Sequence, residues 1–198
     1  MLASQSPRRK SLLDQLGYTF SVQASDIDEA MIVHELPADY VMRLALAKAD
    51  KVFRTLSDKG QKTTVVLGSD TSVVLDNIIL GKPNNLTQCI NTLSLLSNRQ
   101  HEVLTAVAVV SASKIETKLV RTKVLFKAVT LAEIKAYWKT GEPLDKAGSY
   151  AIQGIAGQFI KTINGSYSAV VGLPLYETAE LLSCFGLPTI LHNVDSSL

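Results

Sequence analysis

The sequence predicts an α/β fold, in which helices flank a mixed, twisted sheet. Two observations lead to this prediction. Apolar runs of strand length alternate along the chain with segments whose apolar residues recur at helical spacing. Residues that favour helix starts and helix ends bracket the second kind of segment. Strands and helices that interleave in this way are typical of the α/β class, and the predicted hairpins make the sheet mixed.

The chain is long enough to bury a substantial core. It has 198 residues, of which 46% are hydrophobic. This length fits one domain, or two lobes around a shared cleft. Neither an internal repeat nor a linker rich in Pro, Gly or Ser divides the sequence. We therefore treat residues 1–198 as a single domain, and we expect the tail from about residue 190 to 198 to be flexible.

The first predicted element is a short helix that begins after Ser6. Ser6 is a favourable N-cap, Pro7 suits the first helical position, and Gly17 is a helix-ending residue. Residues 18–23 follow as a predicted strand, and the acidic loop 26–29 comes after them. The chain thus opens with a helix and a strand before its first acidic cluster.

A second helix, a buried strand and a hairpin are predicted next. Pro37 opens the helix, which runs to about Leu56 and carries an apolar stripe on one face. Residues 63–68 form a short apolar run typical of a buried strand. We expect this strand to end at Ser69-Asp70-Thr71. A hairpin follows, with its turn at Asp76-Asn77.

The second half of the chain continues the alternation of helices and strands. Its predicted elements are the helix 86–96, the strands 103–110 and 118–128, the helix 131–139, the strand 159–163 and the helix 174–185. Thr130 and Glu133 have the spacing of a capping box at the start of the helix 131–139.

Charge and composition exclude several classes of protein. The formal net charge is only +2, so the chain has no strong overall positive potential that would favour binding to nucleic acid or an acidic membrane. No run of about 18 apolar residues occurs, and we expect no membrane span. The cysteines Cys89 and Cys184 lie far apart, and the N-terminus lacks the apolar core of a signal peptide. The expected location is therefore the reducing cytoplasm.

The segment Ser4–Lys10 is the first candidate anion site. A helix N-terminus offers free N–H groups and the positive end of the helix dipole to an anion. Arg8 and Arg9 fall in the first turn, where cations are disfavoured unless something negative lies beside them. The pair is consistent with a phosphate clamp, because the guanidinium fork matches phosphate geometry. Two solvated surface arginines would have the same pattern.

Lys48, Asp70 and Glu29 are the candidates for the reaction itself. Helical spacing places Lys48 on the apolar stripe, where it either extends to the surface or reaches a cleft. Asp70 follows a buried strand, and ligands of open α/β sheets bind beyond strand ends. An Asp-Thr pair there can equally form a turn or a helix cap. Glu29 could join Asp70 in binding a hard divalent cation, although acidic loops are often simply solvated.

Loops later in the chain add weaker candidates. The segments Gly81-Lys82-Pro83 and Asp145-Lys146-Ala147-Gly148 each place a lysine in a loop rather than on an amphipathic helix. The segment Tyr150-Ala151-Ile152-Gln153-Gly154 places the Gln153 amide in a glycine-bounded turn. An amide there can match both donors and acceptors on a base. Each of these signals is weak alone.

Together, these segments resemble the signature motifs of the Maf family of nucleotide pyrophosphatases. The matching motifs are Ala3-Ser4-Gln5-Ser6-Pro7-Arg8-Arg9, Leu67-Gly68-Ser69-Asp70-Thr71, Gly81-Lys82-Pro83, Leu144-Asp145-Lys146-Ala147-Gly148, Ile152-Gln153-Gly154, and Gly165-Ser166-Tyr167 with Val171-Gly172-Leu173-Pro174. They follow the family's order and cover the chain from residue 2 to about residue 187.

The resemblance implies a fold and a chemistry. The fold would be related to the inosine-triphosphate pyrophosphatases, with a deep cleft between two lobes and a homodimeric assembly. Asp70 would be the catalytic proton acceptor, and a divalent cation, Mg²⁺ or Mn²⁺, would take part. From the residues themselves, we expect Asp70 to take the proton of water or to hold this cation, with Glu29 as its second ligand. We expect the phosphates of the nucleotide to be bound by the side chains of Ser4, Arg9, Lys48 and Lys82.

The resemblance also indicates a branch of the family. Arg8, Thr71 and Gln153 match the branch that hydrolyses dTTP and UTP to monophosphate and pyrophosphate. A branch that acts on 7-methyl-GTP carries Trp in the first motif, Gln after the aspartate, and Glu in place of Gln153. The substrates of the expected hydrolase would include modified pyrimidine nucleotides. The enzyme would then have a house-cleaning role, with a link to cell division arrest. The alternative is a nucleotide-binding regulatory protein with little turnover.

Overall fold

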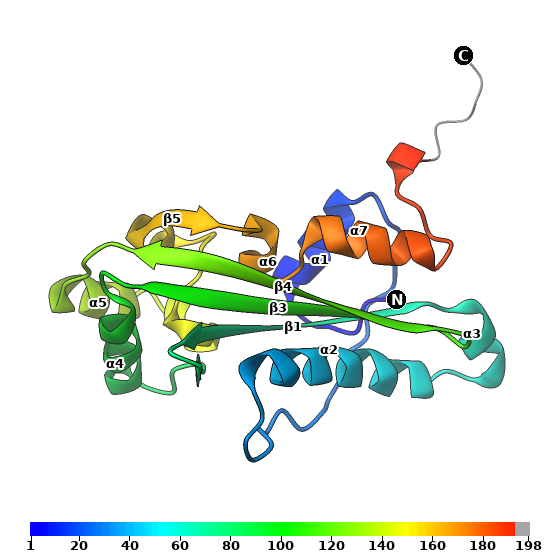
Figure 1. Ribbon diagram of the computed structural model, residues 1–198, viewed down its shortest axis with the longest axis horizontal. Helices are drawn as coiled ribbons and strands as arrows, with labels where there is room; N and C mark the ends of the chain where they lie inside the picture. The colour runs from blue at the N-terminus through cyan, green and yellow to red at the C-terminus, as the bar shows by residue number, and fades with distance from the viewer. Residues whose placement is uncertain (193–198) are drawn as a thin grey trace. The chain divides into compact units, whose positions relative to one another are not determined.

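The computed structural model describes residues 1–192 of the chain (Figure 1). Its α-helices are α1 (Pro7–Gln15), α2 (Pro37–Arg54), α3 (Asp58–Thr63), α4 (Leu86–Leu96), α5 (Leu131–Trp138), α6 (Tyr167–Val171) and α7 (Leu175–Cys184). Its strands are β1 (Val66–Leu75), β2 (Ile78–Leu80), β3 (Gln100–Val110), β4 (Ile115–Phe126) and β5 (Ile160–Asn164). The short 3-10 helices are η1 (Glu142–Asp145), η2 (Ala147–Ser149), η3 (Ile155–Phe159) and η4 (Ile190–His192). The α/β class is confirmed.

The five strands form one sheet in the order β2-β1-β3-β4-β5. β1 and β2 pair antiparallel, with Val73 opposite Leu80, and β4 pairs antiparallel with β5. Parallel pairing occurs at the start of the chain, where Leu2 bridges both Val22 and Leu67. These bridges tie the first residues to β1, and so position the segment that leads into α1.

Local signals for turns and helix starts are confirmed. Asp76 and Asn77, which connect β1 to β2, have φ angles of 50° and 65°, as a two-residue hairpin turn that matches strand twist requires. The Ser6 hydroxyl accepts a hydrogen bond from the backbone N–H of Arg9 at 3.4 Å. Thr130 caps α5 together with Glu133 in a complete capping box. These features depend on residues close in sequence, which is why the sequence predicts them.

The chain divides into two compact units. Unit 1 contains Met1–Asp70, Thr105–Leu119 and the chain from Gly172 onward, and unit 2 contains Thr71–Leu104 and Val120–Val171. The long strands β1, β3 and β4 contribute residues to both units. The active-site cleft that two lobes were expected to share stays a prediction.

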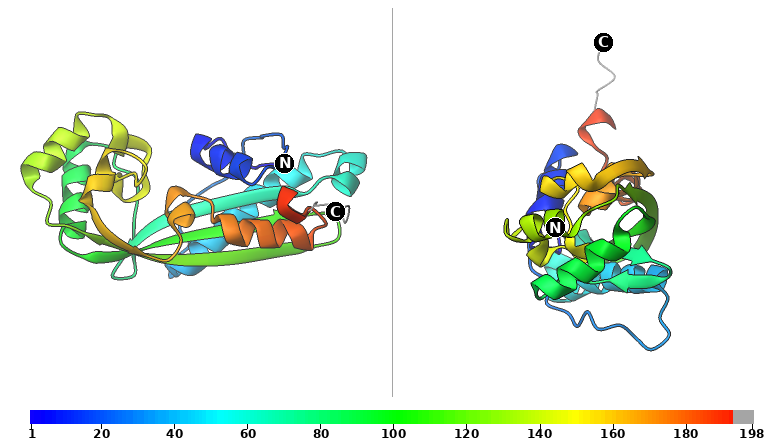
Figure 2. Two further views of the ribbon diagram at one scale, coloured as in Figure 1. Left: turned by 90° about the horizontal axis from the view of Figure 1, so that it is seen from above. Right: turned by 90° about the vertical axis from the view of Figure 1, so that its left-hand side faces the viewer.

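In unit 1, helices cover both faces of the sheet. α2 lies on one face, and α1 and α7 lie on the other (Figures 1 and 2). The buried face of α2 is the stripe expected from the sequence, and Lys48 is buried within it. Leu2 and Ala3 are fully buried. The start of the chain is therefore part of this core, which places Ser4 directly before α1.

Unit 2 has a core of its own, to which β1, α4, α5 and η3 contribute. Aromatic rings stand edge to face within it. The ring centroids of Phe126 and Tyr150 are 4.9 Å apart, and those of Tyr137 and Phe159 are 5.4 Å apart. This is the arrangement that the ring quadrupoles favour. The core therefore fixes Tyr137 in α5 and Tyr150, which stands just before the turn that contains Gln153.

The first long strand continues further than expected. β1 runs from Val66 to Leu75, so the prediction that it ends at residues 69–71 is wrong, and Asp70 lies in the middle of the strand. Tertiary contacts keep these polar residues in a buried strand. The Ser69 hydroxyl donates to the backbone carbonyl of Gly172 at 3.0 Å, and Asp70 accepts a hydrogen bond from Lys48.

Several other elements differ from expectation. Residues 18–23 do not form the predicted strand; among these described residues the structure has only the bridge at Val22. The short helices α3 and α6 were not anticipated. In the tail, residues 190–192 form η4, and the remainder lies outside the described residues. Along residues 1–192, every helix is too short or too polar to cross a membrane.

Candidate active site

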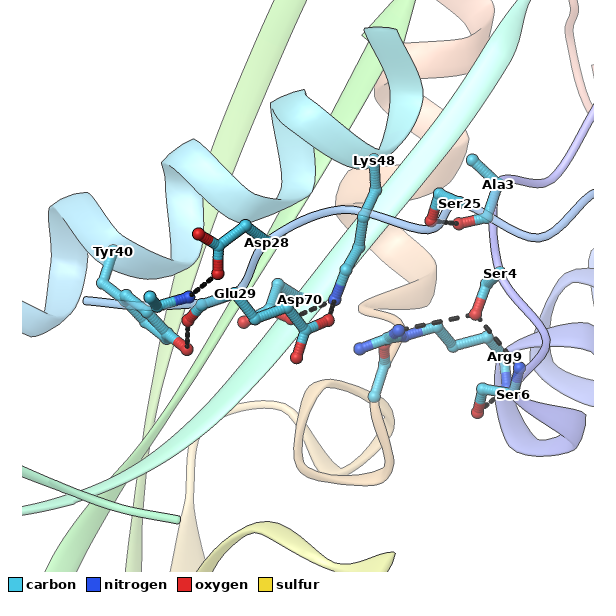
Figure 3. Close-up of polar contacts among 12 residues, drawn as sticks. Ala3, Ser4, Ser6, Arg9, Ser25, Asp28, Glu29, Tyr40, Lys48 and Asp70 are labelled. Carbon is cyan, nitrogen blue, oxygen red and sulfur yellow. Dashed lines mark hydrogen bonds and ion pairs between the residues drawn. The ribbon is translucent and has the colours of Figure 1, made fainter. Parts of the chain in front are cut away.

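The ammonium group of Lys48 lies between two carboxylates (Figure 3). Its Nζ is 2.7 Å from Oδ1 of Asp70 and 2.6 Å from Oε1 of Glu29. Lys48 and Asp70 are each 7% exposed, whereas the Glu29 side chain is 47% exposed. Two carboxylates therefore form ion pairs with the same ammonium group, and Glu29 is the more exposed of the two.

These three groups come from separate segments of unit 1. Asp70 lies in β1, Lys48 on the buried face of α2, and Glu29 in the loop before that helix. The sequence left open whether Lys48 extends to the surface or reaches inward. Its burial and its bond to Asp70 show that it points inward. A buried charge is costly without a partner, so the pairing explains how α2 tolerates a lysine on its apolar face.

The environment of Asp70 changes its affinity for protons. Burial raises the pKa of the Asp70 carboxyl, while the positive charges of Lys48 and Arg9 oppose this effect. The nearby Glu29 carboxylate raises the pKa of Asp70 as well. The net result is a carboxyl that holds a proton more readily than an ordinary aspartate. This suits a group that must take a proton from water.

The loop that carries Glu29 is held on α2 by side chains that the sequence did not single out. The Tyr40 hydroxyl donates to the backbone carbonyl of Glu29 at 2.9 Å. Nη2 of Arg43 donates to the carbonyl of Ala30 at 3.0 Å. Arg43 also pairs with both carboxylate oxygens of Glu35, at 2.5 and 2.7 Å. Helical spacing could have placed Tyr40 and Arg43 on one face, but not against this loop.

The N-terminus of α1 is organised around Ser4 and Arg9. The Ser4 hydroxyl accepts hydrogen bonds from the backbone N–H of Ser6 at 3.1 Å and from Nη1 of Arg9 at 3.5 Å. Nε of Arg9 donates to the carbonyl of Gly172 at 2.9 Å. Ser4 therefore orients Arg9 and the first turn of the helix. Its direct contact with phosphate stays a prediction.

Arg9 brings a second positive charge to the two carboxylates. Burial lowers the pKa of the Arg9 guanidinium, and Asp70 and Glu29 oppose that effect. The adjacent Arg8, which is half-exposed, lowers it further. Both arginines lie at the positive end of the α1 dipole, where neighbouring cations repel one another. An anion bound there would relieve the repulsion, as the predicted phosphate clamp requires.

The remaining expected site residues belong to unit 2. Thr71 is half-buried in β1, while Lys82 and Gln153 are exposed on loops. The backbone N–H of Gly148 donates to the carbonyl of Gly81 at 3.1 Å. This bond joins the Lys82 loop to the loop that contains Lys146.

The expected site residues thus fall into two groups. Unit 1 brings together most of them, namely Ser4, Arg8, Arg9, Glu29, Lys48 and Asp70. Thr71, Lys82 and Gln153 are each described within unit 2. A single site that combines both groups stays a prediction.

The pair of Glu29 and Asp70 suits a hard divalent cation. Among residues 1–192, no three His, Cys, Asp or Glu side chains are grouped so that they could hold a metal ion. Mg²⁺, however, is commonly bound through one or two carboxylates together with substrate phosphates. The two carboxylates already converge on the Lys48 ammonium at 2.6 and 2.7 Å. The donor set therefore fits a cation that arrives with a phosphorylated substrate.

The chain matches known proteins along nearly its whole length. The family model described as Maf-like protein matches residues 1–185. A dTTP/UTP pyrophosphatase of Colwellia psychrerythraea is 62% identical over 193 residues, which cover 98% of this chain and 91% of the relative. The protein of the same name from Vibrio vulnificus is 52% identical over 185 residues, covering 93% and 97% of the two chains. That of Pseudoalteromonas translucida is 51% identical over 184 residues, covering 93% and 95%.

Proposed function

Because this chain belongs to the Maf-like protein family, we propose that it hydrolyses dTTP and UTP to dTMP or UMP and pyrophosphate. Relatives that are 50–62% identical over almost the whole chain bear the name dTTP/UTP pyrophosphatase, which supports the proposal. Such an enzyme is a nucleoside triphosphate diphosphatase, a hydrolase of acid anhydrides. Modified pyrimidine nucleotides belong to the proposed substrates, in a house-cleaning role linked to cell division arrest.

The observation that carries the proposal is the position of Lys48 between Asp70 and Glu29. A carboxylate with a raised pKa can take a proton from water. The neighbouring cations can bind the substrate, since Arg9 lies beside this pair at the N-terminus of α1. A site with both properties suits hydrolysis of a phosphoanhydride.

The proposed reaction is an in-line attack of water on the α-phosphorus. The water oxygen forms a bond to this phosphorus, and the bond from phosphorus to the bridging oxygen of the β-phosphate breaks. The bridging oxygen keeps the electron pair and leaves as part of pyrophosphate. Asp70 accepts the proton of the attacking water and later releases it to solvent. Water is a poor nucleophile near neutral pH, so a positioned base lowers the barrier.

Lys48 has a second role in this step. While Asp70 is ionised, the ammonium is bound to its carboxylate at 2.7 Å. When Asp70 takes the proton, its negative charge disappears, and Asp70 no longer neutralises the charge of Lys48. The ammonium can then stabilise the negative charge that grows on the phosphates, as fixed cations do in phosphoryl transfer. Proton uptake and charge stabilisation would thus be coupled through one hydrogen bond.

We also propose that Mg²⁺ or Mn²⁺ binds with the nucleotide, held by Glu29 and Asp70. A divalent cation, when bound, neutralises phosphate charge and lowers the pKa of coordinated water. Glu29 is well placed to turn from Lys48 toward a cation, because its side chain is 47% exposed. Lys48 would keep Asp70 as its partner during that movement, so no buried charge would be left alone.

We assign nucleotide selection to Arg8, Thr71 and Gln153, and we assign phosphate binding to Ser4, Arg9, Lys48 and Lys82. The exposure of Gln153 and Lys82 on loops supports contact with a ligand. A site that hydrogen-bonds a base can reject analogues lacking the partner group by roughly 10⁴-fold. A few small polar side chains are therefore enough to set base preference.

Pyrophosphate release tests the proposal directly. The purified chain would be assayed with dTTP, UTP, dCTP, dGTP and 7-methyl-GTP, in Mg²⁺, in Mn²⁺ and in EDTA. We expect release from dTTP and UTP with either cation and loss of release in EDTA. Tight dTTP binding without release would instead favour a nucleotide-binding regulator.

We further propose that the protein is a homodimer in the cytoplasm. The family resemblance supports the dimer, and the free thiols of Cys89 and Cys184 agree with a reducing compartment. Analytical ultracentrifugation would test the assembly. A monomer at micromolar concentration would contradict it.

A further inference from the structure

Glu142 binds the chain immediately after the turn that carries Gln153. Its Oε2 accepts a hydrogen bond from the backbone N–H of Ile155 at 2.9 Å, and its Oε1 accepts one from the N–H of Ala156 at 3.3 Å. Oε1 also accepts a hydrogen bond from the Tyr137 hydroxyl at 2.8 Å. One carboxylate of η1 therefore joins α5 to the start of η3.

These bonds replace a cap that the local sequence does not supply. Gly154 is the N-cap residue of η3 and has no side chain that could accept a hydrogen bond. The first N–H groups of a helix need an acceptor from elsewhere. Glu142 provides it from a different segment, and its negative charge suits the start of a helix.

Glu142 packs so closely on Gly154 that a side chain there would displace its carboxylate. A Cβ at Gly154 would lie 2.2 Å from Oε2 and 2.4 Å from Oε1 of Glu142. Such distances are far below van der Waals contact. The carboxylate thus rests directly on the backbone of the residue that follows Gln153.

Gln153 lies in the middle of a turn that is held on both sides. The backbone N–H of Gly154 donates to the carbonyl of Ala151 at 3.1 Å, which closes the turn around Ile152 and Gln153. Before the turn, the Tyr150 hydroxyl is 2.8 Å from Nε2 of the buried His101. After the turn, Glu142 binds the two N–H groups. The Gln153 side chain itself is exposed.

We propose that Glu142 is a positioning residue for base recognition, which holds the turn so that the Gln153 amide meets the edge of the base. This inference rests on the proposed function. Thymine and uracil share one edge, with an N–H donor beside a carbonyl acceptor, and cytosine reverses the two. A glutamine amide carries both a donor and an acceptor, so its side chain alone matches either edge. Holding the backbone of Gln153 in one place limits the positions and orientations in which the amide can reach the base, and so allows one edge to be preferred.

The test compares nucleotide preference in three variants of unit 2. Glu142→Ala removes the acceptor for both N–H groups, Glu142→Gln keeps one amide oxygen as acceptor, and Glu102→Ala is the matched control. Glu102 is a partly exposed residue of the same unit that pairs with Arg121 at 3.6 Å. For each variant, kcat and KM for dTTP and dCTP would be measured beside the thermal unfolding temperature.

We expect Glu142→Ala to lower kcat/KM for dTTP by about tenfold and to reduce the dTTP to dCTP preference several-fold, mainly through KM. Asp70 and Lys48 belong to unit 1 and are unchanged, so kcat should fall less. Glu142→Gln should recover part of the preference, and Glu102→Ala should keep all of it. If Glu142→Ala does not fold, Glu142→Gln and Tyr137→Phe carry the test, because each removes only part of the contact.

Two results would overturn the inference, and they are distinguishable. A folded Glu142→Ala protein with a lower unfolding temperature but an unchanged nucleotide preference would mean that Glu142 only stabilises the fold. The proposed function would then stand. A wild-type protein that releases no pyrophosphate from any nucleotide would overturn the proposed function and the positioning role together.

Discussion

Gly68 of β1 lies directly against the backbone of Ala45 in α2. A Cβ added at Gly68 would be 2.4 Å from the Ala45 carbonyl oxygen and 2.8 Å from the backbone nitrogen of Ala49. The helix therefore rests on the strand with no side chain between them. Lys48 lies in the same turn of α2, and Asp70 follows Gly68 by two residues on the same strand face. The absence of one side chain thus brings Lys48 within hydrogen-bond distance of Asp70.

Gly68→Ala should destabilise the protein and separate this pair. The added methyl group meets backbone atoms, which cannot move aside as a flexible side chain can. We expect a loss of about 3 kcal/mol in the free energy of unfolding, at the upper end for overpacked cores. Urea denaturation would measure it. Gly81→Ala is the control, since a Cβ there meets nothing within 4 Å; equal effects of the two changes would contradict the argument.

Asp70→Asn should abolish most of the hydrolysis while preserving the fold. The amide keeps the shape of the carboxylate but cannot take the proton of the attacking water. We expect kcat to fall on the order of 10²–10⁴-fold, with little change in KM. Asp76→Asn is the control, because Asp76 is an exposed aspartate that pairs with Arg99. Wild-type turnover in folded Asp70→Asn would remove Asp70 from the reaction.

Lys48→Met tests the charge balance of the site. The change leaves the buried Asp70 carboxylate and the partly exposed Glu29 without their shared cation. We expect a loss of about 3 kcal/mol in the free energy of unfolding, as for other broken buried pairs. In the Asp70→Asn background the same change should cost about 1 kcal/mol, since the buried negative charge is already gone. Additive effects in this double-mutant cycle, measured by urea denaturation, would show that the two groups do not interact.

The double variant Thr71→Gln, Gln153→Glu should hydrolyse dTTP much less efficiently, while the stability of its fold should change only slightly. Gln153 is exposed and Thr71 is half-buried, so neither change removes a large part of the core. We expect kcat/KM for dTTP to fall by about tenfold or more, because the selecting hydrogen-bond groups are altered. The assay would compare dTTP, UTP and 7-methyl-GTP. An unchanged order of preference in the folded double variant would exclude these residues from base selection.

His101 should make unit 2 sensitive to acid. Burial lowers the pKa of His101 from 6.5 to about 4. Between these values the unfolded chain binds a proton that the folded protein does not. The stabilisation is therefore complete above pH 6.5 and is lost as the pH falls to about 4. The full effect is on the order of 3 kcal/mol.

Urea denaturation at pH 7.5, 6 and 5 would measure this dependence. His101→Gln is the reference, because an amide can still bond to the Tyr150 hydroxyl but does not titrate. The stability of wild type should fall more steeply with acid than that of the variant. Parallel curves for the two proteins would show that His101 is not the source.

The sequence predicts many residues of the candidate site, but it does not predict the contacts between them. Motifs identified Ser4, Arg9 and Asp70 individually, and helical spacing identified Lys48. They did not predict that the Ser4 hydroxyl is bonded to Arg9 within unit 1. Nor did they indicate the residues that hold the loop of Glu29, because a tyrosine and an arginine on a helix have many possible partners. Glu142 was missed for the same reason, since its role depends on the two N–H groups it meets.

Features that depend on a few neighbouring residues can be predicted from the sequence alone. The capping box at Thr130, the turn at Asp76-Asn77 and the bounds of α4 follow from local hydrogen bonds and apolar spacing. The continuation of β1 through Asp70 and the inward direction of Lys48, by contrast, follow from how the chain packs. A buried charge is tolerated only where an opposite charge lies beside it. Such a pairing depends on how separate segments pack, which no local pattern specifies.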